Sequence, residues 1–224
     1  MTDKSSMPEL YYGAYEFDVC GKYIYHDAKN PIYVFIVDTS IEAFKNKLFD
    51  QALYVISNSL DSIPNPENTQ ICILTVDMYV NCYTVSEDMS KGLKMHQVSD
   101  IGDPFLPLPI ETLMMNLVND REKIDFMIEK LSEVHYNEEI KYKLSTLNLS
   151  SALTIAYEML EPSGGRVLAF YSKIENCGPG INKLNENHKS YNTDAEKEMF
   201  KPNLDYYNTL AKKMFEKRIT VDMF

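Results

Sequence analysis

The chain has 224 residues, of which 45% are hydrophobic and 25% are charged, and its formal net charge is −11. This apolar content suffices for one substantial core, whereas 33 acidic against 22 basic residues disfavour nucleic-acid binding, because phosphate backbones attract clustered Lys and Arg. No stretch reaches the ~18 consecutive apolar residues of a membrane-spanning helix, and the first ten residues lack the basic start and apolar segment of a secretory signal.

The four cysteines and four histidines are scattered along the chain. No two cysteines form a CxxC pair, and no histidine lies near another. We therefore expect reduced thiols and no zinc site within this chain.

Hydrophobic periodicity predicts alternating strands and helices in the first half. Tyr11–Val19 alternates like a strand, and Ile32–Asp38 is a continuous apolar run typical of a strand buried on both faces. Apolar residues three or four apart predict one helix over 41–60, which ends before the prolines of SIPNPEN. Ile71–Val76 predicts a second buried strand, and Tyr79–Val85 follows after two residues, which is hairpin spacing.

The second half continues the alternation. A short strand is predicted at Met95–Asp100, followed by a proline-rich segment at Ile101–Pro109 and two helical segments at Ile110–Val118 and Asp120–Leu131. An amphipathic helix at 149–160 leads to a buried strand at Arg166–Ser172 and a polar loop at 175–199. A further helix at 204–215 and a last strand at Ile219–Phe224 complete the order. This order predicts a doubly wound, mostly parallel α/β sheet with helices on both faces, and the hairpin strand adds an antiparallel edge.

Two regions follow from this order. Residues 1–30 precede the α/β core, and we expect them to be a lead-in whose strand belongs to a separate β layer. Residues 31–224 form the main domain. A terminal strand needs a neighbour, so we expect this domain to continue beyond Phe224.

Asp38-Thr39-Ser40 lies at the carboxyl end of the first core strand, where ligands bind in doubly wound sheets. No glycine-rich turn follows, which argues against a nucleotide-using α/β enzyme. The pattern matches the metal-binding D-x-S-x-S of von Willebrand A domains only in part, because Glu42 replaces the second serine. Asp38 and Ser40 are thus the metal candidates. We favour strand termination by Asp38 and helix capping by Ser40, with no metal bound.

The sequence shows no catalytic constellation. A Ser-His-Asp set, HExxH and GxSxG are all absent. Cys177 in Glu175–Gly180 could be a nucleophile in a turn, but a Gly-Pro-Gly strand exit is the favoured interpretation. Asp18, Asp100 and Asp103 have no identifiable acid–base partner. We predict that the chain is not an enzyme.

Several segments together resemble the trunk domain of the cargo-selecting subunit of the inner COPII vesicle coat, the Sec24 family, which has a von Willebrand A-like fold. They are PELYYGAYEF, NPIYVFIVDTS, HQVSDIGDPFLPLP, the glycine-rich Ser150–Gly180 and DYYNTLAKKMFEKRITVDMF. Each motif alone is weakly diagnostic. The ordered set covers essentially the whole chain.

This resemblance implies a cytoplasmic coat component for transport from the endoplasmic reticulum to the Golgi. Its trunk would pair with the Sec23 subunit, join the Sar1 GTPase peripherally on membranes of ER exit sites, and help to recognise export-signal peptides of cargo. The family's zinc finger precedes the trunk, so no cofactor is implied here. The alternative is a metal-dependent von Willebrand A-type adhesion or chaperone domain that uses Asp38 and Ser40.

Four residues are candidate partner or cargo contacts. His26 stands where the family often has an arginine, and Asp100, Asp103 and Phe105 lie in or beside DPFLPLP. The favoured alternative makes DPFLPLP a proline-rigidified connector whose Phe105 and Leu106 plug the core.

Overall fold

The computed structural model describes residues 7, 10, 12–14, 16, 29–137, 144–181, 188–199 and 205–224, with only the backbone described at 137, 198 and 199. The predicted strand at Tyr11–Val19 and its separate β layer lie largely outside these residues, and His26 lies outside them. The division between residues 1–30 and 31–224 therefore stays a prediction.

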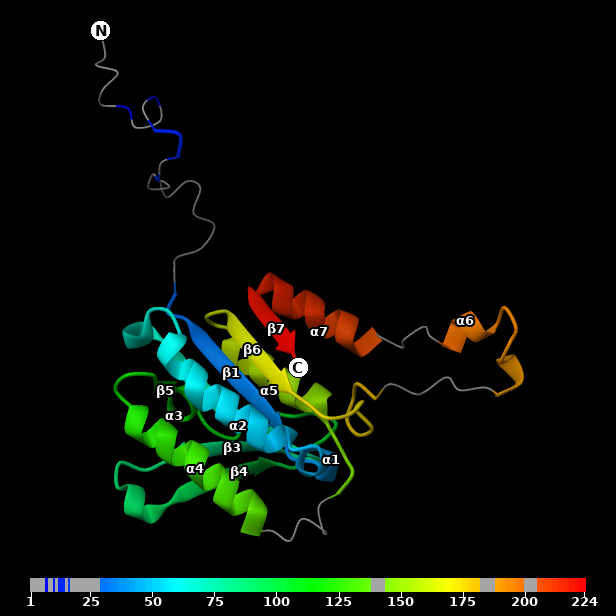
Figure 1. Cartoon of the computed structure of the whole chain (residues 1–224), viewed down its shortest axis with the longest axis horizontal. Coiled ribbons are helices and arrows are strands. Elements are labelled where there is room, and N and C mark those ends of the chain that lie inside the picture. The colour runs from blue at the N-terminus through cyan, green and yellow to red at the C-terminus, as the bar shows by residue number, and fades with distance from the viewer. Residues whose placement is uncertain are drawn as a thin grey trace.

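The centre of the fold is a seven-stranded sheet in the order β4-β3-β2-β1-β6-β7, with β5 beside β2 (Figure 1). The strands are β1 Ile32–Asp38, β2 Gln70–Val76, β3 Val80–Val85, β4 Leu93–Val98, β5 Met115–Asn116, β6 Gly165–Phe170 and β7 Ile219–Met223. β2, β1, β6 and β7 are joined by parallel pairings, whereas β3, β4 and β5 pair antiparallel. The antiparallel edge thus contains two strands, with β4 outermost, rather than the hairpin strand alone.

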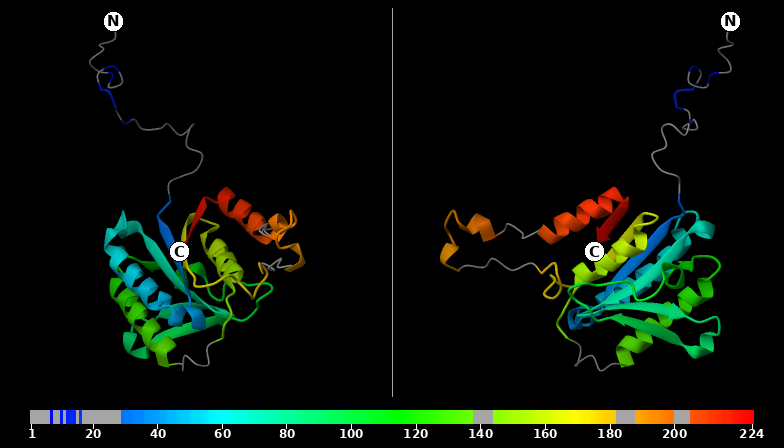
Figure 2. Two further views of the ribbon diagram at one scale, coloured as in Figure 1. Left: turned by 45° about the vertical axis from the view of Figure 1, so that its right-hand side comes forward. Right: turned by 180° about the vertical axis from the view of Figure 1, so that it is seen from behind.

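Helices cover both faces of this sheet. They are α1 Ile41–Lys45, α2 Leu48–Ser59, α3 Ile110–Leu113, α4 Arg121–Asn137, α5 Leu149–Leu160, α6 Glu196–Met199 and α7 Asp205–Glu216, with 3-10 turns at Leu60–Ser62, Pro66–Asn68, Met89–Lys91 and His188–Ser190. α2 and α4 lie on one face and α5 and α7 on the other (Figures 1 and 2). The doubly wound arrangement is therefore confirmed.

β1 is the strand that both cores share. It pairs with β2 along its whole length on one side, and with β6 from Tyr33 to Val37 on the other. Val34 and Ile36 point to the core under α5 and α7, while Phe35 and Val37 point to the core under α2 and α4. Burying such a side chain stabilises the fold by roughly 1.5–3 kcal/mol, which explains why this strand is aliphatic or aromatic at every position before Asp38.

The single helix predicted over 41–60 is wrong. α1 ends at Lys45, and Lys47 adopts a left-handed conformation with φ 58° before α2 begins at Leu48. The break turns the chain between the first loop and α2, while Ala43 and Phe44 of α1 join Phe49 of α2 in one core. The helical spacing of apolar residues continues through the break, so hydrophobic periodicity alone does not indicate it.

The helix predicted over Ile110–Val118 is also wrong beyond Leu113. Met115 and Asn116 form β5 against β2. The side-chain oxygen of Asn116 accepts hydrogen bonds from the backbone N–H of Val118 and Asn119, at 3.0 and 2.8 Å. Asn116 thereby closes a turn, because short amide side chains compete with helical hydrogen bonding.

Among the described residues, no helix is both long enough and apolar enough to span a membrane.

Candidate functional site

Asp38 joins two loops at the carboxyl edge of the sheet. Its Oδ1 accepts the backbone N–H of Ser40 at 2.7 Å, and its Oδ2 accepts the backbone N–H and the hydroxyl of Ser172 at 2.8 and 2.6 Å. Asp38, Thr39 and Ser40 are fully buried. The carboxylate therefore ties the chain after β1 to the chain after β6.

The two metal candidates, Asp38 and Ser40, supply one carboxylate and one hydroxyl. Within the part of the chain that the structure describes, no group of three or more His, Cys, Asp or Glu side chains is placed to hold a metal ion. Ser40 occupies the N-cap position of α1, but its side chain makes no capping hydrogen bond and lies 3.3 Å from the Ser172 hydroxyl. Ser40 is therefore the N-cap residue, as predicted, but without a capping hydrogen bond from its side chain. That Asp38 and Ser40 bind no metal stays a prediction. The hydrogen bonds that Asp38 accepts from Ser40 and Ser172 favour a structural role.

A second polar cluster surrounds Glu175, in the loop after β6. Glu175 is 6% exposed, and it accepts hydrogen bonds from the backbone N–H and hydroxyl of Ser150 and from the hydroxyl of Tyr207. Burial raises the pKa of Glu175, against the lowering effect of these hydrogen bonds. The loop is thereby fastened to the start of α5 and to α7.

Cys177 belongs to the same loop. Its backbone N–H donates to the carbonyl of Leu147 at 3.2 Å. Burial and the charges of Glu175 and Asp77 raise the pKa of its thiol, which disfavours the reactive thiolate. These contacts support a structural loop over a nucleophilic turn.

The segment before α3 is a tethered turn. Asp100 Oδ1 accepts the backbone N–H groups of Gly102 and Asp103, both at 3.0 Å. The Ser151 hydroxyl of α5 donates to the Ile101 carbonyl at 3.1 Å. Asp100 thus holds the turn in shape, while Asp103 is exposed.

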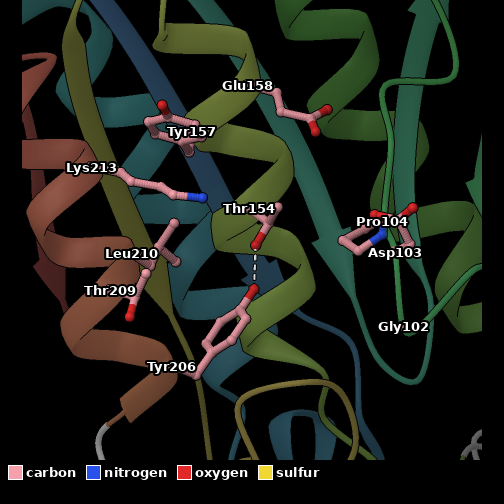
Figure 3. A pocket seen from close by; sticks show the side chains of 10 residues that line it. All are labelled: Gly102, Asp103, Pro104, Thr154, Tyr157, Glu158, Tyr206, Thr209, Leu210 and Lys213. Carbon is pink, nitrogen blue, oxygen red and sulfur yellow. Dashed lines mark hydrogen bonds between the residues drawn. The ribbon is translucent and has the colours of Figure 1, made fainter.

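A groove of about 310 Å³ lies between this turn, α5 and α7 (Figure 3). Its lining residues are Gly102, Asp103, Pro104, Thr154, Tyr157, Glu158, Tyr206, Thr209, Leu210 and Lys213. At one end of the groove the hydroxyl oxygens of Tyr206 and Thr154 are 2.5 Å apart, which joins α7 to α5. Figure 3 shows Lys213 on the α7 side and Asp103 on the side of the turn. The groove brings charged, aromatic and hydroxyl side chains of three segments to one place.

Comparison with known proteins identifies the fold's family. Residues 28–224 match the family model of the Sec23/Sec24 trunk domain. The chain belongs to this family.

Curated relatives extend the trunk match over nearly the whole chain. Protein transport protein sec24 of Aspergillus niger is 28% identical over 225 residues, which cover 99% of this chain and 24% of that protein. The SEC24 protein of Yarrowia lipolytica is 29% identical over 241 residues, with 99% and 25% covered. The chain thus spans about a quarter of the length of these relatives. The predicted trunk resemblance is confirmed.

A solved structure shares the trunk fold. The crystal structure of the human COPII-coat protein Sec24c matches with a TM-score of 0.70 at 22% sequence identity, over 88% of this chain and 26% of that chain. This likeness confirms the predicted fold class.

Phe105 departs from the predicted connector role within the trunk. Its side chain is 57% exposed and does not plug the core, whereas Leu106 is partly buried against the core under α5 and α7. Glu158 and Lys213 were not predicted as site residues, because a single charged residue on an amphipathic helix normally indicates only the solvent-exposed face of that helix. Only the packing of α7 beside α5 brings them to one groove.

Proposed function

We propose that this trunk domain belongs to a subunit of the COPII coat and acts in vesicle transport from the endoplasmic reticulum to the Golgi. It pairs with a Sec23 subunit and contributes to the recognition of export-signal peptides on cargo. In the assembled coat it meets the Sar1 GTPase and lies peripherally on the membrane of ER exit sites. Its role is that of a non-catalytic cytoplasmic adaptor that needs no cofactor in this segment.

The observation that carries this proposal is the match of 99% of the chain to Sec24 proteins. The described surface agrees with an adaptor, since it offers a groove and, directly after the groove-lining Pro104, the exposed aromatic residue Phe105. The alternative, a metal-dependent adhesion or chaperone domain, is disfavoured because the Asp38 oxygens already accept three hydrogen bonds from Ser40 and Ser172.

Co-purification with the Sec23 homologue of the same organism tests the pairing. We expect a stable one-to-one complex by size-exclusion chromatography at micromolar concentration. The same chain mixed with a second, differently tagged copy of itself serves as the control and should stay uncomplexed. Separate elution of two folded proteins, each checked by circular dichroism, would contradict pairing through this trunk segment.

A further inference from the structure

The groove between the 102–104 turn, α5 and α7 has fixed walls. The turn is closed by Asp100 and tied to α5 through Ser151 and Ile101, and Pro104 follows it directly. Leu106 and Leu108 pack against the core after Phe105, and the hydrogen bond between Ser151 and Ile101 holds the chain before it. A site with fixed walls loses little conformational entropy when it binds a ligand.

The charges of the groove are unbalanced. Asp103 and Glu158 line it together with Lys213. Among the described residues, none of these three side chains forms an ion pair. Burial raises the pKa of Glu158, and the charges of Asp103 and Glu161 raise it further, against the lowering effect of a backbone hydrogen bond with Leu106. A cation placed between Asp103 and Glu158 would relieve this repulsion.

An exposed aromatic residue follows the groove-lining turn in the chain. Phe105 directly follows the groove-lining Pro104 and exposes 57% of its surface. Tyr157 lines the groove on the α5 side (Figure 3). Aromatic side chains supply much of the binding energy of protein interfaces and also attract cationic groups.

We propose that this groove binds an extended peptide whose Lys or Arg side chain lies between the carboxylates of Asp103 and Glu158, while a neighbouring apolar side chain packs on Phe105. Charge complementarity supports this occupant, since the carboxylates of Asp103 and Glu158 outweigh the single positive charge of Lys213. A groove of about 310 Å³ accommodates one or two side chains rather than a folded domain. The inference rests on the proposed function, because it names the chemistry of the peptide that the adaptor recognises.

Selection from a displayed library of random eight-residue peptides on the whole chain tests the proposal. We expect enrichment of peptides that carry Lys or Arg next to an aromatic or aliphatic residue. By fluorescence anisotropy, these peptides should bind the Asp103→Asn/Glu158→Gln variant at least about tenfold more weakly, because a charge-assisted contact is lost. Replacement of their arginine by uncharged citrulline should weaken binding to the wild type similarly.

The matched control removes two carboxylates from the opposite face of the sheet, in the α4 variant Glu122→Gln/Glu129→Gln, and should bind like the wild type. Phe105→Ala removes an exposed aromatic side chain that lies outside the core, and it should also weaken peptide binding. Selection of peptides without Lys or Arg, equal binding by the Asp103→Asn/Glu158→Gln variant, or no selected peptide would overturn the proposal. In each of these cases the Sec23 pairing experiment decides separately on the proposed function.

Discussion

Asp38 is the residue that we expect to matter most for stability at the carboxyl edge of the sheet. Asp38→Ala leaves the buried N–H of Ser40 and the N–H of Ser172 without their acceptor, so we expect the free energy of unfolding to fall by about 2–4 kcal/mol. Urea denaturation measures this loss. Asp194→Ala, at a fully exposed position, should change the free energy by less than about 0.5 kcal/mol.

The same variant separates a structural carboxylate from a metal ligand. A bound ion would stabilise the native state by mass action. We expect the wild-type melting temperature to be equal in EDTA and in saturating Mg²⁺. A rise with Mg²⁺ that Asp38→Ala abolishes would favour the metal-dependent alternative.

Glu175 gives the loop after β6 a pH-dependent contribution. Burial raises its pKa above the ordinary value of 4.5. A carboxyl group with a raised folded pKa stabilises the fold below its unfolded pKa and loses that contribution as the pH rises through the folded pKa. The stability of the wild type relative to Glu175→Gln should therefore fall as the pH rises from below 4.5 towards neutrality.

Chemical denaturation of both proteins across this pH range measures the difference. The exposed substitution Glu129→Gln on α4 serves as the control and should give a nearly constant difference. A wild type that gains stability over Glu175→Gln with rising pH would show that the hydrogen bonds from Ser150 and Tyr207 outweigh burial.

At the scale of the elements, Gly165 sets how closely β6 approaches β1. Its φ is +151°, and a Cβ there would lie 2.7 Å from the backbone oxygen of Ile32. We expect Gly165→Ala to lower the free energy of unfolding by about 2–4 kcal/mol, because backbone strain and a backbone clash add. Gly92→Ala is the matched control, since φ is +78° but nothing lies within 4 Å of its Cβ; it should cost only roughly 1–2 kcal/mol. Thermal unfolding measures both losses of stability. Equal losses for Gly165→Ala and Gly92→Ala would contradict the predicted clash with the Ile32 backbone oxygen.

The dense apolar elements could be predicted from the sequence. β1 occupies the predicted Ile32–Asp38, and α5 occupies the predicted 149–160, because burial from both sides or along one wide stripe leaves an unambiguous pattern. The break at Lys47 could not be predicted, since lysine is not a typical left-handed residue. β5 has only two residues, too few to show a period.

Only those residues of the candidate site that lie within one short segment of the sequence could be predicted. The proline-rich segment identified Asp103 and Phe105 as candidates, and it also made Asp100 a candidate, although the structure assigns Asp100 to the turn itself. Glu158 and Lys213 come from helices far apart in the chain. Their meeting depends on how α7 packs beside α5, which a single sequence does not encode in any local pattern.

At the scale of the whole molecule, β1 couples the two cores, and we expect them to unfold together. Leu131→Ala removes a fully buried side chain on α4, and Leu160→Ala removes one on α5, on the other face of the sheet. Each should lower the free energy of unfolding by about 2–5 kcal/mol, because each leaves a cavity. Leu144→Ala, whose side chain is 57% exposed, is the matched control and should have little effect.

Both core variants should still show one transition, with coincident curves from far-UV circular dichroism and tyrosine fluorescence, for which the chain has 16 tyrosines and no tryptophan. The reason is that alternate residues of β1 belong to opposite cores, so neither core can lose its packing while the other keeps an intact strand. Two separate unfolding transitions in either variant would show that β1 does not couple the two cores. In that case the groove beside α5 and α7 could open while α2 and α4 stay folded, and its fixed walls would depend on one core alone.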